Sequence, residues 1–489
     1  MATVAFRFRP RVELLDGTAG ALALPDALAR LAGAVDAPVL FDGGLGTRPP
    51  SSVLAFDPLP ARAPRSLAGL RAFVRRLERL DGDPVPGPFH GGFSGAIAYE
   101  LEAAGRGLAL PADPWTLPPL SGGLYTDFLV RDDERGATWL VLGDEPGDGR
   151  PSVGERSRAL RRVLSQPEPA LELMARGSLR SLATSDEHAA RVRRAREWIA
   201  EGEIYQANLS LRRVCAVHGD PLALYRRLRA LHPAPCAGFL RRRGFALLSA
   251  SPELLLEVTR HEDRFHARTR PIKGTIARGR DAAEDALQAQ RLLASEKDLA
   301  ELAMIVDLER NDLGRVARSG SVRVDGFPRL ESFASVHHLV ADVSAELRPE
   351  VDAVDCLRAV HPGGSVTGAP KLRSMEAIAE LESEGRGYAY GSLLWLDTRG
   401  ELRASLLIRT LIWRATPAQG AGTGEVTFRV GGGITWGSVP EDEVREAEDK
   451  GRMLALSLEP EAAGCDARVQ PTGPAGGGVR GSGTLSCSR

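Results

Sequence analysis

The sequence predicts an α+β protein built from more than one region. Short apolar segments separated by glycine and proline predict many strands, and longer segments with apolar residues at helical spacing predict fewer helices. A chain of 489 residues is too long for one core of ordinary size, so two or more domains or subdomains are expected. The formal net charge of −1 argues against a basic surface for nucleic acid.

The cysteine content and the hydropathy of the chain indicate the cellular compartment in which the protein works. The five cysteines are scattered and lack Cys-x-x-Cys spacing, which is typical of a reducing cytoplasm and argues against a zinc or disulfide framework. No apolar run is long enough to span a membrane, and residues 1–11 lack the apolar segment of a secretory signal. We therefore expect a cytoplasmic protein.

Residues 1–150 form the first predicted region, which consists mainly of strands. Glycines within residues 88–99 predict a strand pair with bulges or close sheet packing. Residues 151–184 are more charged and less regular, so we expect a linker there. The predicted elements are strands at 39–42, 52–56, 95–99 and 139–142 and one helix at 66–80.

Residues 185–458 form the second predicted region, in which the helices become longer. Ser185 is expected to cap the first of them. After residue 459 the chain is rich in Gly, Pro, Ala and Ser without periodicity, so we expect a disordered tail over 459–489. The predicted helices are 186–203, 281–315, 351–357, 371–384 and 441–456, and the predicted strands are 246–258, 265–269, 391–397, 402–414 and 427–430.

A lysine beside a turn is the first candidate for chemistry. Lys273 follows a Pro-Ile step and precedes Gly274, which permits a tight turn. Positive charge from Arg268 and Arg270 would disfavour its ammonium form and favour a nucleophilic amine. The alternative interpretation is an ordinary surface lysine.

The last predicted helix carries acidic residues at an informative spacing. Glu443 and Glu446 are three residues apart and Lys450 follows four residues later, so all three share one helix face. Two carboxylates on one face, with a third from elsewhere, suit Mg²⁺. A solvated face with an i,i+4 ion pair is the alternative.

Two glycine-rich segments have different interpretations. Gly431, Gly432 and Gly433 follow the predicted strand at 427–430, and their backbone amides could bind an anion, although a flexible loop is the alternative. The turn at 362–370 fails the spacing of a nucleotide phosphate loop because Ala369 and Pro370 precede its lysine. This spacing excludes nucleotide binding there.

Several stretches, taken together, resemble the chorismate-utilising enzymes, a family that includes anthranilate, isochorismate, salicylate and aminodeoxychorismate synthases. The stretches occur in family order. The resemblance implies two intertwined subdomains of antiparallel β-sheet with outer helices and an active site in the cleft between them. The matching stretches are Gly-Glu-Ile-Tyr-Gln-Ala-Asn-Leu at 202–209, Ser-Pro-Glu at 251–253, Arg-Pro-Ile-Lys-Gly-Thr at 270–275, 300–315, His-Leu-Val at 338–340, 362–371, Ile-Arg-Thr at 408–410 and 431–450.

The resemblance also implies a metal site and a substrate site. The resemblance implies that the bound Mg²⁺ holds the ring carboxylate of chorismate. The residues that would bind the Mg²⁺ are Glu301, Glu443 and Glu446. The residues that would bind the substrate are Ser365, Thr367, Arg409, Gly431, Gly432, Gly433 and Lys450. His338 matches a histidine that lines the active site, and the resemblance implies a catalytic role for it.

The residue at 273 separates branches of this family. Members that make anthranilate tend to have alanine there, whereas the branch that aminates chorismate to 4-amino-4-deoxychorismate, for para-aminobenzoate and folate, has lysine. The resemblance implies that Lys273 attacks C2 of chorismate while Glu253 protonates the departing C4 hydroxyl. Ammonia would come from a separate glutamine amidotransferase subunit, because the chain has no Gly-x-Cys-x-Gly element.

Other interpretations predict different products. An anthranilate synthase component I would convert chorismate to anthranilate and pyruvate, and a non-catalytic chorismate binder would form no product. The chain departs from the family pattern at Leu302, Ala389 and Leu394, positions at which other residues are usual.

Overall fold

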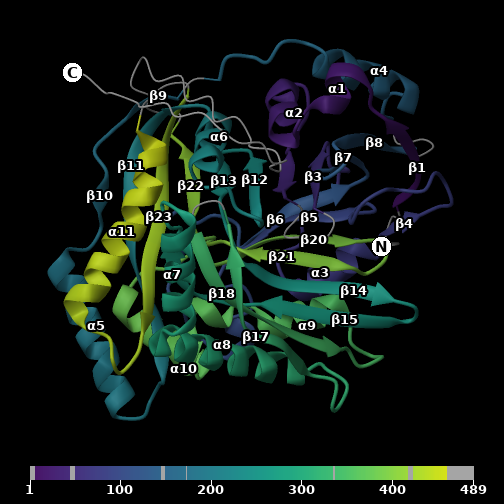
Figure 1. Cartoon of the computed structure of the whole chain (residues 1–489). Helices are drawn as coiled ribbons and strands as arrows, with labels where there is room; N and C mark the ends of the chain where they lie inside the picture. The colour runs from purple at the N-terminus through teal and green to yellow at the C-terminus, as the bar shows by residue number, and fades with distance from the viewer. Residues whose placement is uncertain are drawn as a thin grey trace.

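The computed structural model describes residues 6–43, 50–144, 149–171, 173–333, 336–416 and 422–459. Within these residues the strands form two large sheets with helices outside them, as Figure 1 shows. Neighbouring strands run antiparallel, except that β1 and β4 pair in parallel. The predicted α+β class of two antiparallel sheets is therefore confirmed.

The larger sheet combines strands from both predicted regions. In the described chain it has 14 strands, ordered β10-β11-β23-β22-β13-β12-β2-β3-β7-β8-β1-β4, with β9 and β19 also paired to β11. Its strands are β1 (Phe6–Leu14), β2 (Val39–Asp42), β3 (Ser51–Phe56), β4 (Leu77–Arg79), β7 (Asp127–Asp132), β8 (Ala137–Asp144), β9 (Leu173–Arg176), β10 (Arg180–Ser181), β11 (Gln206–Gly219), β12 (Ala237–Arg242), β13 (Phe245–Ser249), β19 (Gly368–Ala369), β22 (Thr410–Ala415) and β23 (Thr423–Ile434).

The smaller sheet also draws on both regions. Its described strands number nine, in the order β16-β18-β15-β14-β21-β20-β5-β6, with β17 paired to β18. They are β5 (Gly92–Ile97), β6 (Leu120–Tyr125), β14 (Leu254–His261), β15 (Arg264–Arg270), β16 (Ile272–Ala277), β17 (Arg323–Ser332), β18 (Val336–Glu346), β20 (Ser392–Asp397) and β21 (Leu402–Leu406).

The helices cover the outer faces of the sheets. Helix α11 lies along β23 and against α5, on the left in Figure 1, while α8 packs on β16 and β18. The helices are α1 (Gly17–Ala21), α2 (Leu24–Leu31), α3 (Leu67–Val74), α4 (Val153–Leu164), α5 (Ser185–Ala200), α6 (Pro221–Leu231), α7 (Ala282–Leu293), α8 (Glu296–Gly314), α9 (Ala353–Val360), α10 (Lys371–Glu382) and α11 (Pro440–Leu458), with short 3₁₀ turns η1 (Ala104–Arg106) and η2 (Gly364–Val366).

Two strand pairs join the predicted regions. Strand β2 pairs with β12 in the larger sheet, and β5 pairs with β20 in the smaller one. One buried apolar cluster accordingly contains both Phe8 and Ile412. The segment 151–184, expected as a linker, carries α4, β9 and β10, and the predicted tail beyond Glu459 lies outside the described residues.

Several predicted boundaries differ from the structure. The helix expected over 66–80 ends at Val74, because residues 77–79 pair with β1 instead. Thr184, and not Ser185, caps α5: its hydroxyl accepts from the N–H of Glu187, whose carboxylate accepts from the N–H of Thr184. The stretch at 281–315 divides into α7 and α8, because Ser295 caps a new helix.

None of the helices in the described residues is both long enough and apolar enough to cross a membrane.

Candidate active site

Lys273 lies in a strand and not on the turn that the sequence predicted. Strand β16 pairs with β18, and the register shifts between Lys273 and Thr275. Gly274 forms this bulge with a φ of 73°, and a Cβ there would lie 3.0 Å from the side chains of Asp298 and Leu292. Only glycine fits such a position without strain. The bulge therefore fixes the direction in which Lys273 leaves the strand.

The amine of Lys273 faces acidic and glycine-rich neighbours. Its Nζ lies 3.6 Å from Oε2 of Glu301, and 3.3 Å from the point where a Cβ on Gly433 would be. The two upstream arginines, which the sequence placed beside this amine, pair with other residues. Arg268 pairs with Glu257 at 2.7 Å, and Arg270 pairs with Glu331, so both guanidinium groups are bound to carboxylates elsewhere.

Glu253 is a buried acid just before β14. Its side chain is 5% exposed, and its Oε1 accepts a hydrogen bond of 2.7 Å from the hydroxyl of Ser365. Burial raises the pKa of this carboxyl group to about 7, against the opposing effects of the Ser365 hydrogen bond and the charges of Lys273 and Arg409. A carboxyl group that is partly protonated at neutral pH can act as a general acid.

The turn at 362–370 presents Ser365 to this acid. Ser365 and Thr367 are both buried. The hydroxyl of Thr367 donates to the carbonyl oxygen of Gly363 at 2.8 Å, so it closes the turn. Of the two hydroxyl groups predicted to bind substrate, the structure places that of Ser365 on Glu253 and commits that of Thr367 to the backbone.

His338 is buried on β18. Its Nδ1 lies 2.8 Å from the hydroxyl of Thr275, which belongs to the neighbouring strand β16. Burial and the positive charge of Arg409 lower the pKa of His338 to about 4. The imidazole is therefore neutral at pH 7, where it can form hydrogen bonds but cannot act as a cationic acid.

Two of the three predicted metal ligands meet over one glycine. Oε2 of Glu443 and Oε1 of Glu446 lie 3.0 Å and 3.4 Å from the point where a Cβ on Gly432 would be. Burial raises the pKa of Glu443, and the nearby charge of Glu446 adds to this effect. Glu301 reaches the same neighbourhood from α8, where Lys297 lies 4.0 Å from it. In this arrangement, no group of three acidic, histidine or cysteine side chains among the described residues is ready to hold a metal.

The three consecutive glycines lie inside β23 and not in a loop after it. Gly431, Gly432 and Gly433 pair with β11 opposite Ser210, Leu209 and Asn208. They are extended, so they cannot form the alternating turn of a backbone anion nest. Pairing with β22 ends at Thr427, which leaves the other edge of β23 unpaired along the glycines in the described chain.

Lys450 is tied to this strand and to the acidic pair. Its Nζ donates to the carbonyl oxygen of Gly431 at 2.9 Å and to Oε1 of Glu446 at 2.6 Å. The predicted i,i+4 pair on α11 is therefore present. Lys450 lies at the site, but its ammonium group is bound to the protein.

Arg409 lies in the connection between β21 and β22, where the two sheets meet. Its backbone is left-handed, with a φ of 48°, and its carbonyl oxygen accepts from the N–H of Ala250 at 3.1 Å. Burial lowers the pKa of its guanidinium group, and Glu253 contributes the opposing charge. With the described residues this guanidinium forms no hydrogen bond or ion pair, so it is available to an anion.

Gln206 is a site residue that sequence reasoning missed. Its side chain is fully buried on β11, and neither polar atom of its amide has a hydrogen-bond partner among the described residues. A Cβ on Gly433 would clash with this amide and lie close to Lys273, which places Gln206 beside the amine. Gln206 lies within the stretch at 202–209 that resembles the family, but nothing in that stretch separated it from its neighbours.

The fold and the site together define an α+β enzyme in which two antiparallel sheets bring an amine, a buried acid and several carboxylates together. A profile of the chorismate binding enzyme family matches residues 40–455. The chain therefore belongs to this family of chorismate binding enzymes.

Individual relatives carry two different names. The chain is 34% identical over 404 residues to aminodeoxychorismate synthase component 1 of Bacillus subtilis (strain 168), covering 80% of this chain and 82% of the relative. It is 41% identical over 280 residues to anthranilate synthase component 1 of Aquifex aeolicus (strain VF5), covering 57% and 54%. The solved structure of anthranilate synthase component I from Streptococcus pneumoniae TIGR4 matches with a TM-score of 0.68 and 27% identity, over 91% of this chain and 92% of that one.

Proposed function

We propose that the protein aminates chorismate with ammonia to give 4-amino-4-deoxychorismate, for para-aminobenzoate and folate synthesis. The observation that carries this proposal is Lys273, whose amine projects from a fixed bulge toward Glu301 and Gly433. An amine at this place can act as a nucleophile toward the ring, which a small apolar residue could not do. The relatives named aminodeoxychorismate synthase component 1 support the same activity.

The first step would join the enzyme to the substrate. The neutral amine of Lys273 forms a bond to C2 of chorismate, the ring double bonds shift, and the C4–O bond breaks. Glu253 gives its proton to the departing hydroxyl, which leaves as water. Hydroxide is a poor leaving group, so the raised pKa of Glu253 supports its assignment as the acid.

The second step would release the product. Ammonia forms a bond to C4, the double bonds shift back, and the bond between C2 and Lys273 breaks with its electron pair returning to the amine. The proton lost by the new amino group returns to Glu253. Chorismate and ammonia thus become 4-amino-4-deoxychorismate and water, and the enzyme is restored.

Residues around the two steps would bind the anionic groups of chorismate. The guanidinium group of Arg409 suits one carboxylate, and the unpaired edge of β23 at Gly431 and Gly433 offers backbone groups. Ser365 would hold Glu253 in place. His338, being neutral, would hydrogen-bond to the substrate without competing with Glu253 for the role of acid.

The acidic residues fit a hard divalent cation, and we infer that it is Mg²⁺. All donors are carboxylate oxygens, and those of Glu443 and Glu446 converge where Gly432 lacks a side chain. Glu301 would complete the set. A bound Mg²⁺ would supply positive charge for the ring carboxylate of chorismate, which these three carboxylates would otherwise repel.

Ammonia would come from a partner subunit, a glutamine amidotransferase. Relatives that carry the words "component 1" in their names support the existence of a second component. Externally added ammonium salt should replace this partner in the test tube.

One assay tests the proposal directly. The purified chain is incubated with chorismate, Mg²⁺ and an ammonium salt, with and without an aminodeoxychorismate lyase. We expect an aromatic amine only when the lyase is present, because the product still carries its enolpyruvyl group. An aromatic product formed without the lyase would refute the proposal.

The alternative function is that of anthranilate synthase component I. The 41% identity to the Aquifex aeolicus protein is the observation that favours it. It predicts fluorescent anthranilate and pyruvate in the same assay without any lyase, so a single experiment separates the two.

A further inference from the structure

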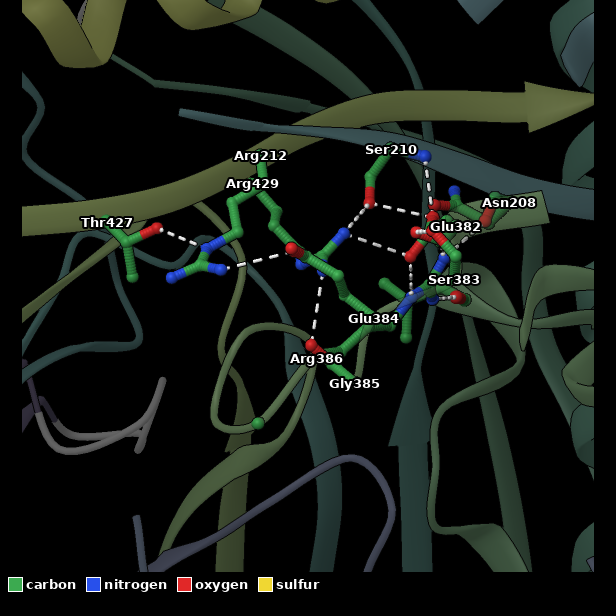
Figure 2. Close-up of polar contacts among 12 residues, drawn as sticks. Asn208, Ser210, Arg212, Glu382, Ser383, Glu384, Gly385, Arg386, Thr427 and Arg429 are labelled. Carbon is green, nitrogen blue, oxygen red and sulfur yellow. Dashed lines mark hydrogen bonds and ion pairs between the residues drawn. The ribbon is translucent and has the colours of Figure 1, made fainter. Parts of the chain in front are cut away.

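A buried ion pair behind the active site holds the turn that carries Ser365. Glu382, the last residue of α10, has a fully buried side chain and accepts five hydrogen bonds (Figure 2). Its donors are the N–H and hydroxyl of Ser210, both at 2.8 Å, Arg386 at 2.7 and 2.9 Å, and Arg429 at 3.1 Å. Burial would raise the pKa of Glu382, but the charges of Arg386 and Arg429 outweigh it and lower the pKa to about 2.

Arg386 connects Glu382 to carbonyl groups of the backbone. Its guanidinium group lies between the rings of Tyr99 and Tyr390, with its carbon 4.7 Å and 4.8 Å from their centroids. Beyond its bonds to Glu382, it donates to the carbonyl oxygens of Val366 at 2.8 Å and Asn208 at 2.6 Å. The buried guanidinium thus joins α10, β11 and the turn.

Three consecutive carbonyl groups of the turn are held in this way. The oxygen of Ser365 accepts from the side-chain amide of Asn208 at 3.3 Å, and the oxygen of Thr367 accepts from the N–H of Asn208 at 2.7 Å. The oxygen of Val366, between them, accepts from Arg386. Holding these three peptides fixes where the Cα–Cβ bond of Ser365 points, and from there its hydroxyl donates to Oε1 of Glu253 at 2.7 Å.

We propose that the ion pair of Arg386 and Glu382 positions the general acid, because through Asn208 and the turn at 365–367 it keeps the hydroxyl of Ser365 on Glu253. Arg386, Glu382 and Asn208 form no hydrogen bond to the carboxyl group of Glu253 or to the hydroxyl of Ser365, so all three are positioning residues. The assignment of Glu253 as acid rests on the proposed function, whereas the positioning of its carboxyl group does not.

This role predicts a specific change in the titration of Glu253. The Ser365 hydroxyl stabilises the ionised carboxylate, so weakening that bond must raise the pKa of Glu253. A hydrogen bond to a charged group corresponds to a shift of about one pH unit. We expect Ser365→Ala to raise the titration midpoint by about one unit, and Asn208→Ala and Arg386→Lys to raise it by about half as much.

Infrared difference spectroscopy measures this midpoint without any substrate. Spectra of each variant are recorded from pH 5 to 9, and those of the same variant carrying Glu253→Gln are subtracted to isolate the Glu253 carboxyl band. Arg212→Lys is the matched control. Arg212 is a largely buried arginine of the same cluster, but it bonds to Thr427 and Glu384 and not to the turn (Figure 2). It should leave the midpoint unchanged.

The turnover of chorismate provides the second readout. Arg386→Lys should move the alkaline limb of the pH–rate profile upward, and combining it with Ser365→Ala should move the limb no further than Ser365→Ala alone. An Arg386→Lys protein that loses activity while its Glu253 midpoint stays in place would overturn the proposal. If that variant does not fold, an unshifted midpoint in Asn208→Ala would overturn it equally. A chain that fails to aminate chorismate would refute the proposed function, while the infrared midpoints would still decide the positioning.

Discussion

Glu253 and Lys273 need opposite protonation states for the proposed reaction. The acid must hold its proton when the substrate arrives, and the amine must have lost one. Burial meets the first requirement by raising the pKa of Glu253 to about 7. The carboxylate of Glu301 lies 3.6 Å from the amine of Lys273 and is also one of the proposed Mg²⁺ ligands.

The raised pKa of Glu253 should be visible in the stability of the fold. Its folded-state pKa of about 7 exceeds the ordinary value of 4.5, so between these values the folded protein binds more protons than the unfolded chain. The free energy of unfolding should therefore fall as the pH rises from 4.5 to 7, by about 3 kcal/mol from this group.

Urea unfolding of the wild type and Glu253→Gln at several pH values checks this. The glutamine variant should gain stability relative to the wild type as the pH rises. A stability difference that is the same at pH 5 and pH 8 would contradict the raised pKa.

Replacing Lys273 tests its proposed role as the nucleophile. Lys273→Ala should reduce formation of 4-amino-4-deoxychorismate roughly a thousandfold or more, because it removes the nucleophile. Lys297→Ala is the matched control, since Lys297 also lies within 4.0 Å of Glu301 but is largely exposed. The control should stay within a few-fold of the wild type in a coupled lyase assay. Unchanged output from Lys273→Ala would refute the covalent step.

At the scale of elements, α11 and β23 act as one unit. The helix supplies Glu443 and Glu446, and the strand supplies the glycine against which both carboxylates rest. A methyl group on Gly432 would press on Oε2 of Glu443 at 3.0 Å and displace it. The absence of a side chain at 432 is therefore part of the proposed Mg²⁺ site.

This arrangement predicts the response of the melting temperature to Mg²⁺. The wild type should melt at a higher temperature in excess Mg²⁺, because a ligand that binds only the folded state stabilises it. Gly432→Ala should lose most of that increase. Gly437→Ala should keep it, because a Cβ at 437 meets nothing within 4 Å. Equal Mg²⁺ responses in the two variants would contradict the site.

The sequence predicted helices and strands better than it predicted which side chains and strands pair with one another. The spacing of Glu443, Glu446 and Lys450 identified one helix face because i, i+3 and i+4 geometry is local. Arg268 and Arg270 were placed near Lys273 by their spacing alone, yet Arg268 pairs with Glu257 across the hairpin of β14 and β15, and Arg270 pairs with Glu331, 61 residues away. The glycines at 431–433 were expected to follow a strand, with a flexible loop as the alternative, because their pairing with β11 joins residues far apart in the sequence.

At the scale of the whole molecule, the two predicted regions share both sheets. Removal of residues 6–144 would expose an edge of β12 in the larger sheet and of β20 in the smaller one. Unpaired edges beside an opened apolar core favour aggregation. Propensity and periodicity indicated strands in both regions, but they contain no information on which strands pair.

Shared sheets predict joint folding of the two regions. In urea, tryptophan fluorescence from Trp115 and Trp139 should change together with that from Trp395 and Trp413, in one transition, because the same core contains both regions. Variants that keep only one of these pairs, with Trp198 and Trp436 also replaced, distinguish the signals. Two separate midpoints would show that the regions fold independently.

The bulge at Gly274 has a consequence for how new activities could arise in this fold. The backbone path through residues 272–275 depends on the glycine and on pairing with β18, and it does not depend on which side chain precedes the glycine. A single substitution at position 273 can therefore change the side chain that enters the site while the surrounding strands keep their backbone positions. If Lys273 acts as we propose, the activity of this fold could change through that one position while the strands around it are kept.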